Sequence, residues 1–340
     1  MSGWAGAARL ERRFSLRKSN LMLTFFSTPK AFRGHIEIIQ RNALESWKRL
    51  HSNIEVILFG VDKGTAEICK EFGLRHIPDT SRSQLGTNRV DSMFERAQQV
   101  SRHDLLCYSN CDIVLTQDFM EAVQRVRAWR SAFLMVGRRW DTAVAGSLDF
   151  AKEDWERRIT ELARREGYHR FYHNIDYFVF TRGLYREMPP LVVGRAHWDH
   201  WMVWKALAQG AAVVDASEDV CAVHQNHDYS HVPEGWKSVS EDQDAQRNFE
   251  LAGGRAHLRT IEDATFRLTA RGVEANRFYW MAPTKRRWRD VGRKIWGTLR
   301  TKAWHRLLDA TRPLRHAVGL KEDSVPAGLR SRKKRHWMDV

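Results

Sequence analysis

Residues Leu105–Asp112 read LLCYSNCD, an apolar run that gives way directly to polar residues. The apolar part predicts a short strand, Leu105–Tyr108, buried on both faces as in a parallel sheet. In open sheets of this kind, ligands bind beyond the carboxyl ends of the strands. The stretch therefore predicts a parallel sheet with Asn110 and Asp112 at its functional edge.

The chain ahead of this stretch alternates between short apolar runs and helical patterns. The expected order is strand Leu21–Phe26, helix His35–Leu50, strand Glu55–Phe59, helix Thr65–Phe72, strand Arg75–Ile77 and helix Val90–Val100. Strands that alternate with helices indicate βαβ units. The first half therefore predicts an α/β fold, with a mostly parallel sheet flanked by helices.

The second half contains fewer clear patterns. The expected strands are Phe133–Val136, Asp176–Phe180, Ala211–Asp215 and Val220–Val223, and the expected helices are Asp149–Glu166 and His200–Gln209. The last of these strands runs directly into a polar cluster that begins at His224.

Positive charge is concentrated at the two ends of the chain. The net charge is +15; residues 1–20, with five Lys/Arg and one acid, carry +4, and residues 281–340, with seventeen Lys/Arg and five acids, carry +12. Residues 21–280 are left with a charge of −1. This pattern divides the chain into a basic N-terminal segment (1–20), a near-neutral domain (21–280) and a basic, Trp-rich tail (281–340).

The tail has the pattern of a basic amphipathic helix. Apolar residues recur every three or four positions from Trp288 to Leu307, with Lys and Arg between them. Such a helix favours an anionic membrane surface. The alternative is a helix packed on the domain with its charges in water.

Localisation follows from what the sequence lacks. No apolar run approaches the roughly 20 residues of a membrane span, and the first 20 residues contain no stretch suited to a secretory signal. The four cysteines form no CxxC pair and are expected to be free thiols. We expect a cytoplasmic protein, peripheral on the inner face of the membrane.

Asn110-x-Asp112 places an amide oxygen and a carboxylate just past a buried strand. Such oxygens suit Mg²⁺ or Mn²⁺, which could in turn bind the phosphates of a nucleotide diphosphate. The alternative is that Asp112 caps the loop or the next element.

The polar cluster His224-Gln225-Asn226-His227 follows the late strand. Two histidines three residues apart can bind a metal or a phosphate. The alternative is a hydrogen-bonded loop.

Trp198-Asp199-His200-Trp201 lies where a loop leads into a helix. Aromatic faces stack on sugars, and a carboxylate beside Trp198 and Trp201 suits a general base that acts on a hydroxyl group. The alternative is that Asp199 caps the helix. Asp176, at the start of a strand, either binds an acceptor hydroxyl or fixes a loop.

The order of these motifs resembles the nucleotide-diphospho-sugar glycosyltransferases of the GT-A type, whose fold is Rossmann-like, and within them a bacterial family-2-like group. The resemblance covers about Leu21 to Gly272. It is carried by Leu23–Phe26, Gln40-Arg41-Asn42 with Trp47, Ile57–Gly60, His76–Asp79, Leu105–Asp112, Val136–Asp141, Ile175–Phe180, Trp198–Trp201, Ala222–His231 and Glu262–Thr265.

The resemblance implies a nucleotide-binding half, residues 21–115, and an acceptor-binding half, residues 116–280. Thr24, Ser27 and Asp62 would face the base and ribose of the donor, and Arg89 would face its diphosphate. Asn110 would belong to the same donor site.

The resemblance also implies a metal site. Asn110-x-Asp112 stands where such enzymes carry an Asp-x-Asp metal motif. Asp112 would therefore be the main ligand, and the motif would carry one negative charge fewer than in those enzymes. His224, with His227, would supply late ligands. Asp199 opens a helix where inverting members keep their base.

These expectations add up to a metal-dependent glycosyltransferase that moves a sugar from a nucleotide-diphosphate donor to a hydroxyl acceptor, with inversion favoured over retention. Cell-envelope polysaccharide or glycolipid synthesis would supply such an acceptor. A nucleotidyltransferase uses a similar sheet, but Ser27-Thr28-Pro29-Lys30 lacks the Gly-rich signature expected after its first strand. A nucleic-acid-binding protein would use the basic ends, but residues 21–280 are close to neutral.

Overall fold

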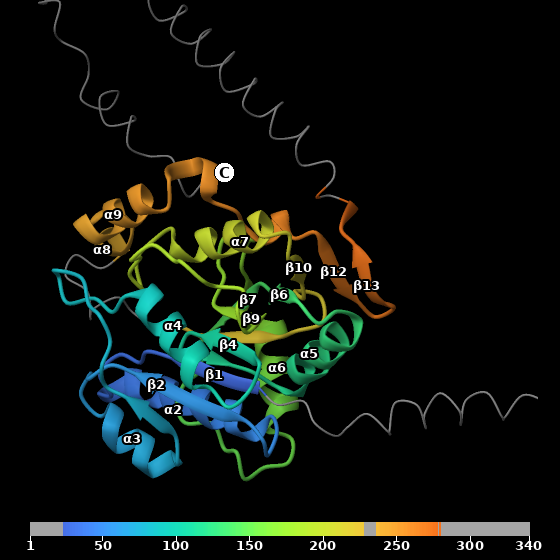
Figure 1. Cartoon of the computed structure of the whole chain (residues 1–340). Coiled ribbons are helices and arrows are strands. Elements are labelled where there is room, and N and C mark those ends of the chain that lie inside the picture. The colour runs from blue at the N-terminus through green and yellow to red at the C-terminus, as the bar shows by residue number, and fades with distance from the viewer. Residues whose placement is uncertain (1–22, 228–235, 278, 280–340) are drawn as a thin grey trace, which may run out of the picture. The chain divides into compact units, whose positions relative to one another are not determined.

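The computed structural model describes residues 23–227, 236–277 and 279 (Figure 1). All of these residues belong to one unit, Met1–Trp280. The basic N-terminal segment, the predicted tail helix and residues 228–231 of the stretch Ala222–His231 lie outside the described residues. The domain limits drawn from the charge pattern therefore stay predictions. Within the described part, no helix is long and apolar enough to cross a membrane.

A nine-stranded sheet runs through the described unit. In spatial order, its strands are β13 (Gly272–Ala275), β12 (Phe266–Thr269), β10 (Ala212–Asp215), β6 (Phe133–Val136), β9 (Tyr177–Thr181), β4 (Leu105–Ser109), β1 (Leu23–Ser27), β2 (Glu55–Phe59) and β3 (Arg75–Ile77). All of them run in one direction except β9 and β13. This confirms the predicted α/β class with a mostly parallel sheet.

Helices cover both faces of this sheet (Figure 1). On one face, a hydrophobic core is shared with α2 (Gly34–Arg49), α3 (Thr65–Phe72) and α5 (Gln117–Trp129). On the other face, a second core is shared with α4 (Val90–Val100) and α7 (Trp198–Ala208). The chain continues through α8 (Trp236–Glu241), α9 (Gln243–Leu251) and two 3-10 turns, Gly254–His257 and Ile261–Asp263.

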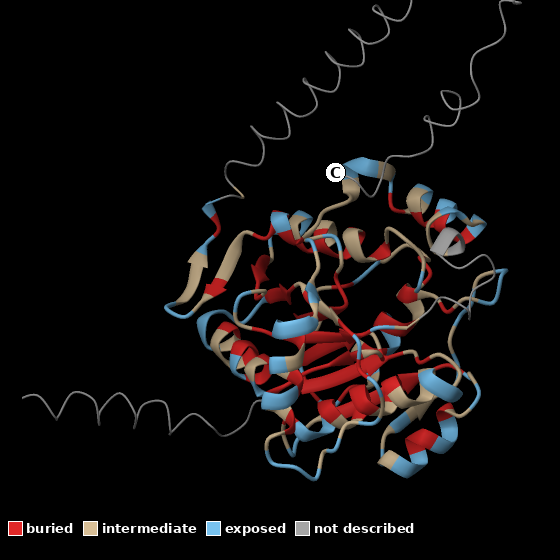
Figure 2. Ribbon diagram, turned by 180° about the vertical axis from the view of Figure 1, so that it is seen from behind, coloured by how far each residue is buried: buried red, intermediate tan, exposed pale blue. Residues whose placement is uncertain are grey.

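The central strands are buried on both faces because they alternate between these two cores (Figure 2). In β4, Leu105 and Cys107 join the first core, whereas Leu106 and Tyr108 join the second. This explains why the strand reads as a continuous apolar run and not as an alternating one.

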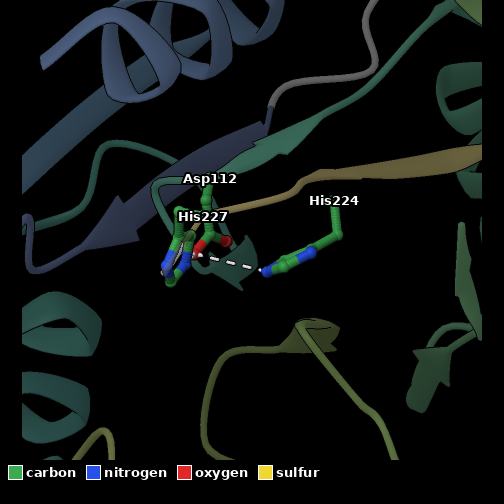
Figure 3. A group of neighbouring side chains, drawn as sticks. All are labelled: Asp112, His224 and His227. Carbon is green, nitrogen blue, oxygen red and sulfur yellow. Dashed lines mark hydrogen bonds and ion pairs between the residues drawn. The ribbon is translucent and has the colours of Figure 1, made fainter. Parts of the chain in front are cut away.

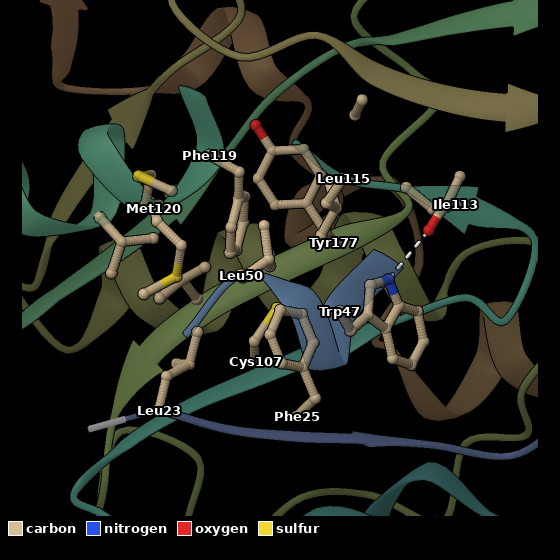
Figure 4. Close-up of a cluster of buried hydrophobic side chains, with 14 of the residues drawn as sticks. Leu23, Phe25, Trp47, Leu50, Cys107, Ile113, Leu115, Phe119, Met120 and Tyr177 are labelled. Carbon is tan, nitrogen blue, oxygen red and sulfur yellow. Dashed lines mark hydrogen bonds between the residues drawn. The ribbon is translucent and has the colours of Figure 1, made fainter. Parts of the chain in front are cut away.

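The first core also fixes the segment that follows β4 (Figure 4). The ring of Trp47 stacks on Phe25, with centroids 5.1 Å apart. Its indole nitrogen donates a hydrogen bond of 2.9 Å to the backbone oxygen of Ile113. A buried tryptophan on α2 therefore holds the backbone directly after Asp112.

A second, four-stranded sheet continues from the first. Its order is β5 (Ile113–Val114), β11 (Ala222–Gln225), β7 (Arg139–Thr142) and β8 (Tyr168–His169). Helix α6 (Trp155–Glu166) packs against it. The chain enters β5, β7 and β11 shortly after leaving β4, β6 and β10. The carboxyl ends of three strands of the large sheet therefore lead into one small sheet.

The predicted boundaries differ from the structure mainly in the second half. Helix α6 begins at Trp155 and not at Asp149, because the Asp149 carboxylate accepts a hydrogen bond from Ala151 N in a turn. The late strand is Ala222–Gln225 and not Val220–Val223, because its pairing with β7 continues to Gln225. Strand β9 is antiparallel to both of its neighbours.

All four cysteines are free, as predicted, and all four are buried. Burial raises the pKa of Cys69 to about 11 and the pKa values of Cys111 and Cys221 to about 12. These side chains are therefore neutral thiols at physiological pH, and they are poor nucleophiles and poor metal ligands in that form.

The end of β6 approaches the ring of Tyr177 closely at Gly137. A Cβ atom at Gly137 would overlap the Tyr177 hydroxyl, which is buried and has no hydrogen-bond partner within the described part of the chain. We therefore expect Gly137→Ala to lower the free energy of unfolding by about 1–3 kcal/mol, as overpacking does. Urea denaturation measures this change.

Tyr177→Phe provides the control for this prediction. Alone it should be close to neutral, because the hydroxyl that it removes makes no hydrogen bond in the described part. Combined with Gly137→Ala, it should restore part of the lost stability. Equal losses in the single Gly137→Ala variant and the double variant would contradict the proposed overlap.

Candidate metal centre

The pairing of β5 with β11 brings Asp112 and His224 together. The strands are antiparallel, with Ile113 opposite His224. Gln225 N donates a hydrogen bond of 3.1 Å to the backbone oxygen of Asp112. Two segments that are far apart in the sequence therefore present their side chains at the carboxyl end of β4.

Asp112, His224 and His227 form a triad whose potential ligand atoms all lie within 4.8 Å of one another. Figure 3 shows both imidazole rings beside the Asp112 carboxylate. Nε2 of His227 lies 3.2 Å from Oδ2 of Asp112, and Nε2 of His224 lies 3.8 Å from the same oxygen. Oδ1 of Asp112 is buried and accepts no hydrogen bond from the described residues. One carboxylate and two imidazoles in this arrangement fit a divalent metal ion.

The charges around the triad keep Asp112 ionised. Burial acts to raise its pKa, but His224, His227 and Lys30 outweigh this effect and hold the pKa well below its usual range. The Lys30 ammonium lies 3.4 Å from Nε2 of His227. The backbone of Lys30 is in turn held by Gln40, which accepts from Lys30 N at 2.7 Å and donates to Lys30 O at 2.9 Å.

A second carboxylate, Asp141, lies behind His224. Strand β7 pairs with β11 so that Asp141 is opposite His224, and Oδ1 of Asp141 lies 3.2 Å from Nδ1 of the imidazole. Arg139 Nε donates to Oδ1 at 2.8 Å, and Arg170 Nε donates to Oδ2 at 2.5 Å. Burial acts to raise the pKa of Asp141, but His224 and the two arginines hold it well below its usual value.

Asn110 supports the site and does not point its amide toward the triad. Its Nδ2 donates to Oδ1 of Asp176 at 2.7 Å, and its Oδ1 accepts from the Tyr108 hydroxyl at 3.1 Å. Asp176 also binds Arg139 Nη1 through both oxygens, at 2.8 and 2.7 Å. The expected role of Asn110 beside the donor therefore becomes one of holding the backbone ahead of Asp112. Asp176 was expected to bind an acceptor. Its carboxylate already accepts hydrogen bonds from Asn110 and Arg139, and the residue is 5% exposed.

The residues expected at the donor lie near the same edge of the sheet. Ser27 ends β1, and its hydroxyl donates to the backbone oxygen of Ser109 at 2.5 Å. Asp62 follows β2 and lies 3.8 Å from Arg82. Arg89 directly precedes α4 and pairs with Asp91 at 2.5 Å. Asp62 and Arg89 are both partly exposed, so their side chains can be reached by a ligand.

Thr24 is not brought to this edge. It lies near the amino end of β1, where its hydroxyl donates to Glu55 at 2.8 Å and lies 3.0 Å from Nδ1 of His103. Thr24 is fully buried in this polar cluster. The expectation that it faces the donor therefore needs correction: in a five-residue strand, Thr24 is too far from the carboxyl end that Ser27 occupies.

The two tryptophans expected in an acceptor pocket are part of the second core. Trp198 is 5% exposed and packs against Tyr108 and Phe178, with centroids 5.2 and 5.5 Å away. Trp201 is 4% exposed and belongs to the same core. The expectation of sugar stacking on these rings needs correction, because both of them are buried in the second core.

Asp199 lies in the first turn of α7 and is not its N-cap. The helix begins at Trp198 after His197, whose φ of 86° is left-handed. Oδ1 of Asp199 accepts a hydrogen bond of 2.9 Å from His200 N, and its side chain is 21% exposed. No contact between Asp199 and the triad occurs among the described residues. Its nearest link to the site is the packing of its neighbour Trp198 on Tyr108.

Sequence reasoning missed Asp141 and Lys30 as site residues. Asp141 lies on a short strand of mixed polarity, and only its pairing with β11 places it beside His224. Lys30 lies in the loop after β1. That loop follows the carboxyl end of a parallel strand, where ligands bind in such sheets. This position was the one feature of the sequence that could have indicated Lys30.

Neither a protein-family model nor a curated protein matches the sequence. Solved structures that are similar to this chain include S. aureus TarS in complex with UDP-GlcNAc, with a TM-score of 0.46 and 10% identity over 68% of this chain. The match spans 65% of the TarS chain, which is less than two thirds of its length.

Glucosyl-3-phosphoglycerate synthase from Mycobacterium tuberculosis is also similar. Its complex with Mg²⁺ and UDP gives a TM-score of 0.41 and 12% identity over 75% of this chain and 85% of that one. Its complex with Mn²⁺, UDP-glucose and phosphoglyceric acid gives 0.42 and 11% over 68% and 80%. At these values, the function of the present chain has to be argued from its own residues.

Proposed function

We propose that the chain is a glycosyltransferase that moves a sugar from a nucleotide-diphosphate donor to a hydroxyl acceptor with the help of a divalent metal ion. The observation that carries this proposal is the triad of Asp112, His224 and His227 at the carboxyl end of β4. This is the edge of the sheet at which nucleotide ligands bind in α/β folds. The sequence resemblance to GT-A enzymes supplies the class of donor.

The ligand types favour Mn²⁺ over Mg²⁺. Mg²⁺ prefers oxygen ligands alone, whereas first-row transition metals also accept imidazole nitrogen. Three protein ligands leave coordination positions for the two phosphates of a donor. When bound, the metal would neutralise charge on the leaving diphosphate, which is Lewis-acid assistance.

The side chains near the triad have proposed roles in holding the donor. Lys30 places an ammonium group beside His227, where it can pair with a phosphate oxygen. Arg89 can offer a second cation if a phosphate replaces its partner Asp91. Asp62 and the end of β1 at Ser27 would face the ribose and base.

Asp199 is the proposed general base in an inverting reaction. Its Oδ2 lies 3.9 Å from Nε2 of His200, and its partly exposed carboxylate is one that an acceptor hydroxyl could reach. In this role Asp199 accepts the proton of the acceptor hydroxyl while the diphosphate leaves from the opposite face of the sugar.

Two rival functions make different demands. A nucleotidyltransferase would release inorganic pyrophosphate from a nucleoside triphosphate, whereas a glycosyltransferase releases a nucleoside diphosphate. A nucleic-acid-binding protein would need no metal triad in its near-neutral domain. Product analysis separates the first rival, and a salt-dependent gel shift separates the second.

Asp112→Asn should abolish Mn²⁺ binding and reduce transfer to background, because the triad would lose its one carboxylate. Asn110→Ala should weaken Mn²⁺ binding less, because Asn110 acts through Asp176 and the backbone. Isothermal titration with Mn²⁺, followed by a donor-hydrolysis assay, measures both effects.

His224→Ala and His227→Ala extend this prediction. Each should weaken Mn²⁺ binding and, in the presence of metal, the binding of a nucleoside diphosphate. Thermal unfolding of each variant shows whether it is folded. Wild-type Mn²⁺ affinity in a folded Asp112→Asn variant would rule out the metal site.

Asp199→Asn should lower kcat by roughly 10²–10⁴-fold with little change in donor affinity, as expected for a group that takes a proton in the transition state. Steady-state kinetics together with a donor titration test this expectation. A parallel loss of donor affinity and thermal stability would instead assign Asp199 to the structure of α7.

We also propose that residues 281–340, which lie outside the described residues, bring the enzyme to an anionic membrane with a lipid-linked or envelope acceptor. Each basic residue near such a surface contributes on the order of 1 kcal/mol. Deleting residues 284–340 should leave donor hydrolysis intact and abolish flotation with anionic liposomes at low salt. Equal flotation of the two proteins would show that the tail is not the membrane contact.

A further inference from the structure

We infer that Asp141 is a positioning residue of the proposed metal centre, which holds His224 so that Nε2 faces Asp112. The inference rests on the proposed metal site and extends it to a residue outside the triad. Asp141 would act through the imidazole of His224 and would not itself bind the metal.

The register of the small sheet creates this arrangement. Asp141 and His224 are opposite one another on the parallel strands β7 and β11, so their side chains project from the same face. Nδ1 of His224 lies 3.2 Å from Asp141, although it is not aligned for a hydrogen bond within the described part, and Nε2 lies 3.8 Å from Asp112. The ring therefore has one carboxylate at each nitrogen.

The two nitrogens of a neutral imidazole ring have different roles in these two contacts. A neutral imidazole carries one N–H group and one lone pair. A carboxylate beside Nδ1 favours the N–H group there, which leaves the lone pair on Nε2, the nitrogen that faces Asp112. Histidines that bind metals commonly donate their other ring nitrogen to a carboxylate, and Asp141 is the carboxylate within reach of Nδ1.

Asp141 is itself held on both oxygens. Arg139 binds Oδ1 at 2.8 Å and Arg170 binds Oδ2 at 2.5 Å. Arg139 continues to Asp176, which accepts a hydrogen bond from Asn110. The polar chain thus begins two residues before Asp112 and returns to it through His224.

Low exposure limits the access of water to this series of polar contacts. The side chains of Arg139, Asp141 and His224 are 10%, 12% and 10% exposed. Little water can therefore replace their mutual contacts, and each buried contact is costly to leave unmade. A simpler reading is that Asp141 only neutralises two arginines. In that case its removal would change stability and leave the affinity of the folded protein for metal unchanged.

The test compares the Mn²⁺ affinity of the full chain with that of Asp141→Ala, Asp141→Asn and Asp219→Asn by calorimetry. Asp141→Ala should weaken Mn²⁺ binding 10–100-fold, the range typical for the loss of such a partner. Asp141→Asn should weaken it less, because the amide oxygen can also accept a hydrogen bond from Nδ1.

Asp219→Asn is the matched control. Asp219 is also a partly buried carboxylate, 18% exposed and 2.5 Å from Arg125, and it makes no contact with the triad among the described residues. Its substitution should leave Mn²⁺ affinity unchanged. Wild-type affinity in a folded Asp141→Ala protein, or an equal loss in Asp219→Asn, would overturn the role of Asp141.

A second measurement needs no variant at Asp141 and so does not depend on its folding. In the wild-type protein loaded with Zn²⁺ as a diamagnetic probe, ¹⁵N spectra should show His224 protonated at Nδ1, with its signals assigned by their loss in His224→Gln. Protonation at Nε2 would overturn the inference. If wild-type protein binds no Mn²⁺ at all, the proposed metal site fails, and the role of Asp141 fails with it.

Discussion

The antiparallel pairing of β5 with β11 is the interaction on which the candidate site depends. Strand β5 has only two residues, and alone it would provide little stability. It is held by the Trp47 indole, which donates to Ile113 O, and by Gln225 N, which donates to Asp112 O. A shift of the strand register by one residue would move the side chain of His224 to the other face of the small sheet and separate it from Asp112.

The same small sheet explains how so many charges can be buried together. Burying one charge is costly unless a partner of opposite sign accompanies it. Here Arg139 lies between the carboxylates of Asp176 and Asp141, and the imidazole of His224 lies between those of Asp141 and Asp112. At the proposed metal site, an ion would add a positive charge beside the Asp112 carboxylate, which now has Lys30 and the two imidazoles around it.

Much of the fold could be predicted from the sequence because the central strands are buried on both faces. A continuous apolar run such as Leu105–Tyr108 is then visible without knowledge of its neighbours. The direction of β9 could not be predicted, because strand direction depends on pairing and not on local composition. The short strands β5 and β8 have two residues each, which is too few for any periodicity.

The residues of the candidate site could be predicted only where a ligand-type side chain directly follows a recognisable apolar strand. Asp112, His224 and His227 were visible as polar residues after apolar strands, and the structure brings them together. Trp198 and Trp201 carried the same aromatic signal whether they faced a sugar or the core, and they face the core. Asp141 had no signal of its own, because its relation to His224 exists only across a strand pair.

The four buried thiols give this protein a built-in set of probes for local opening. Cys69 lies in α3, Cys107 in β4, Cys111 directly before Asp112, and Cys221 directly before β11. A thiol reagent can modify each of them only during the moments when its surroundings unfold. Labelling rates at Cys111 and Cys221 would therefore report how often the two halves of the site separate, and the rate at Cys107 would report how often the centre of the sheet opens.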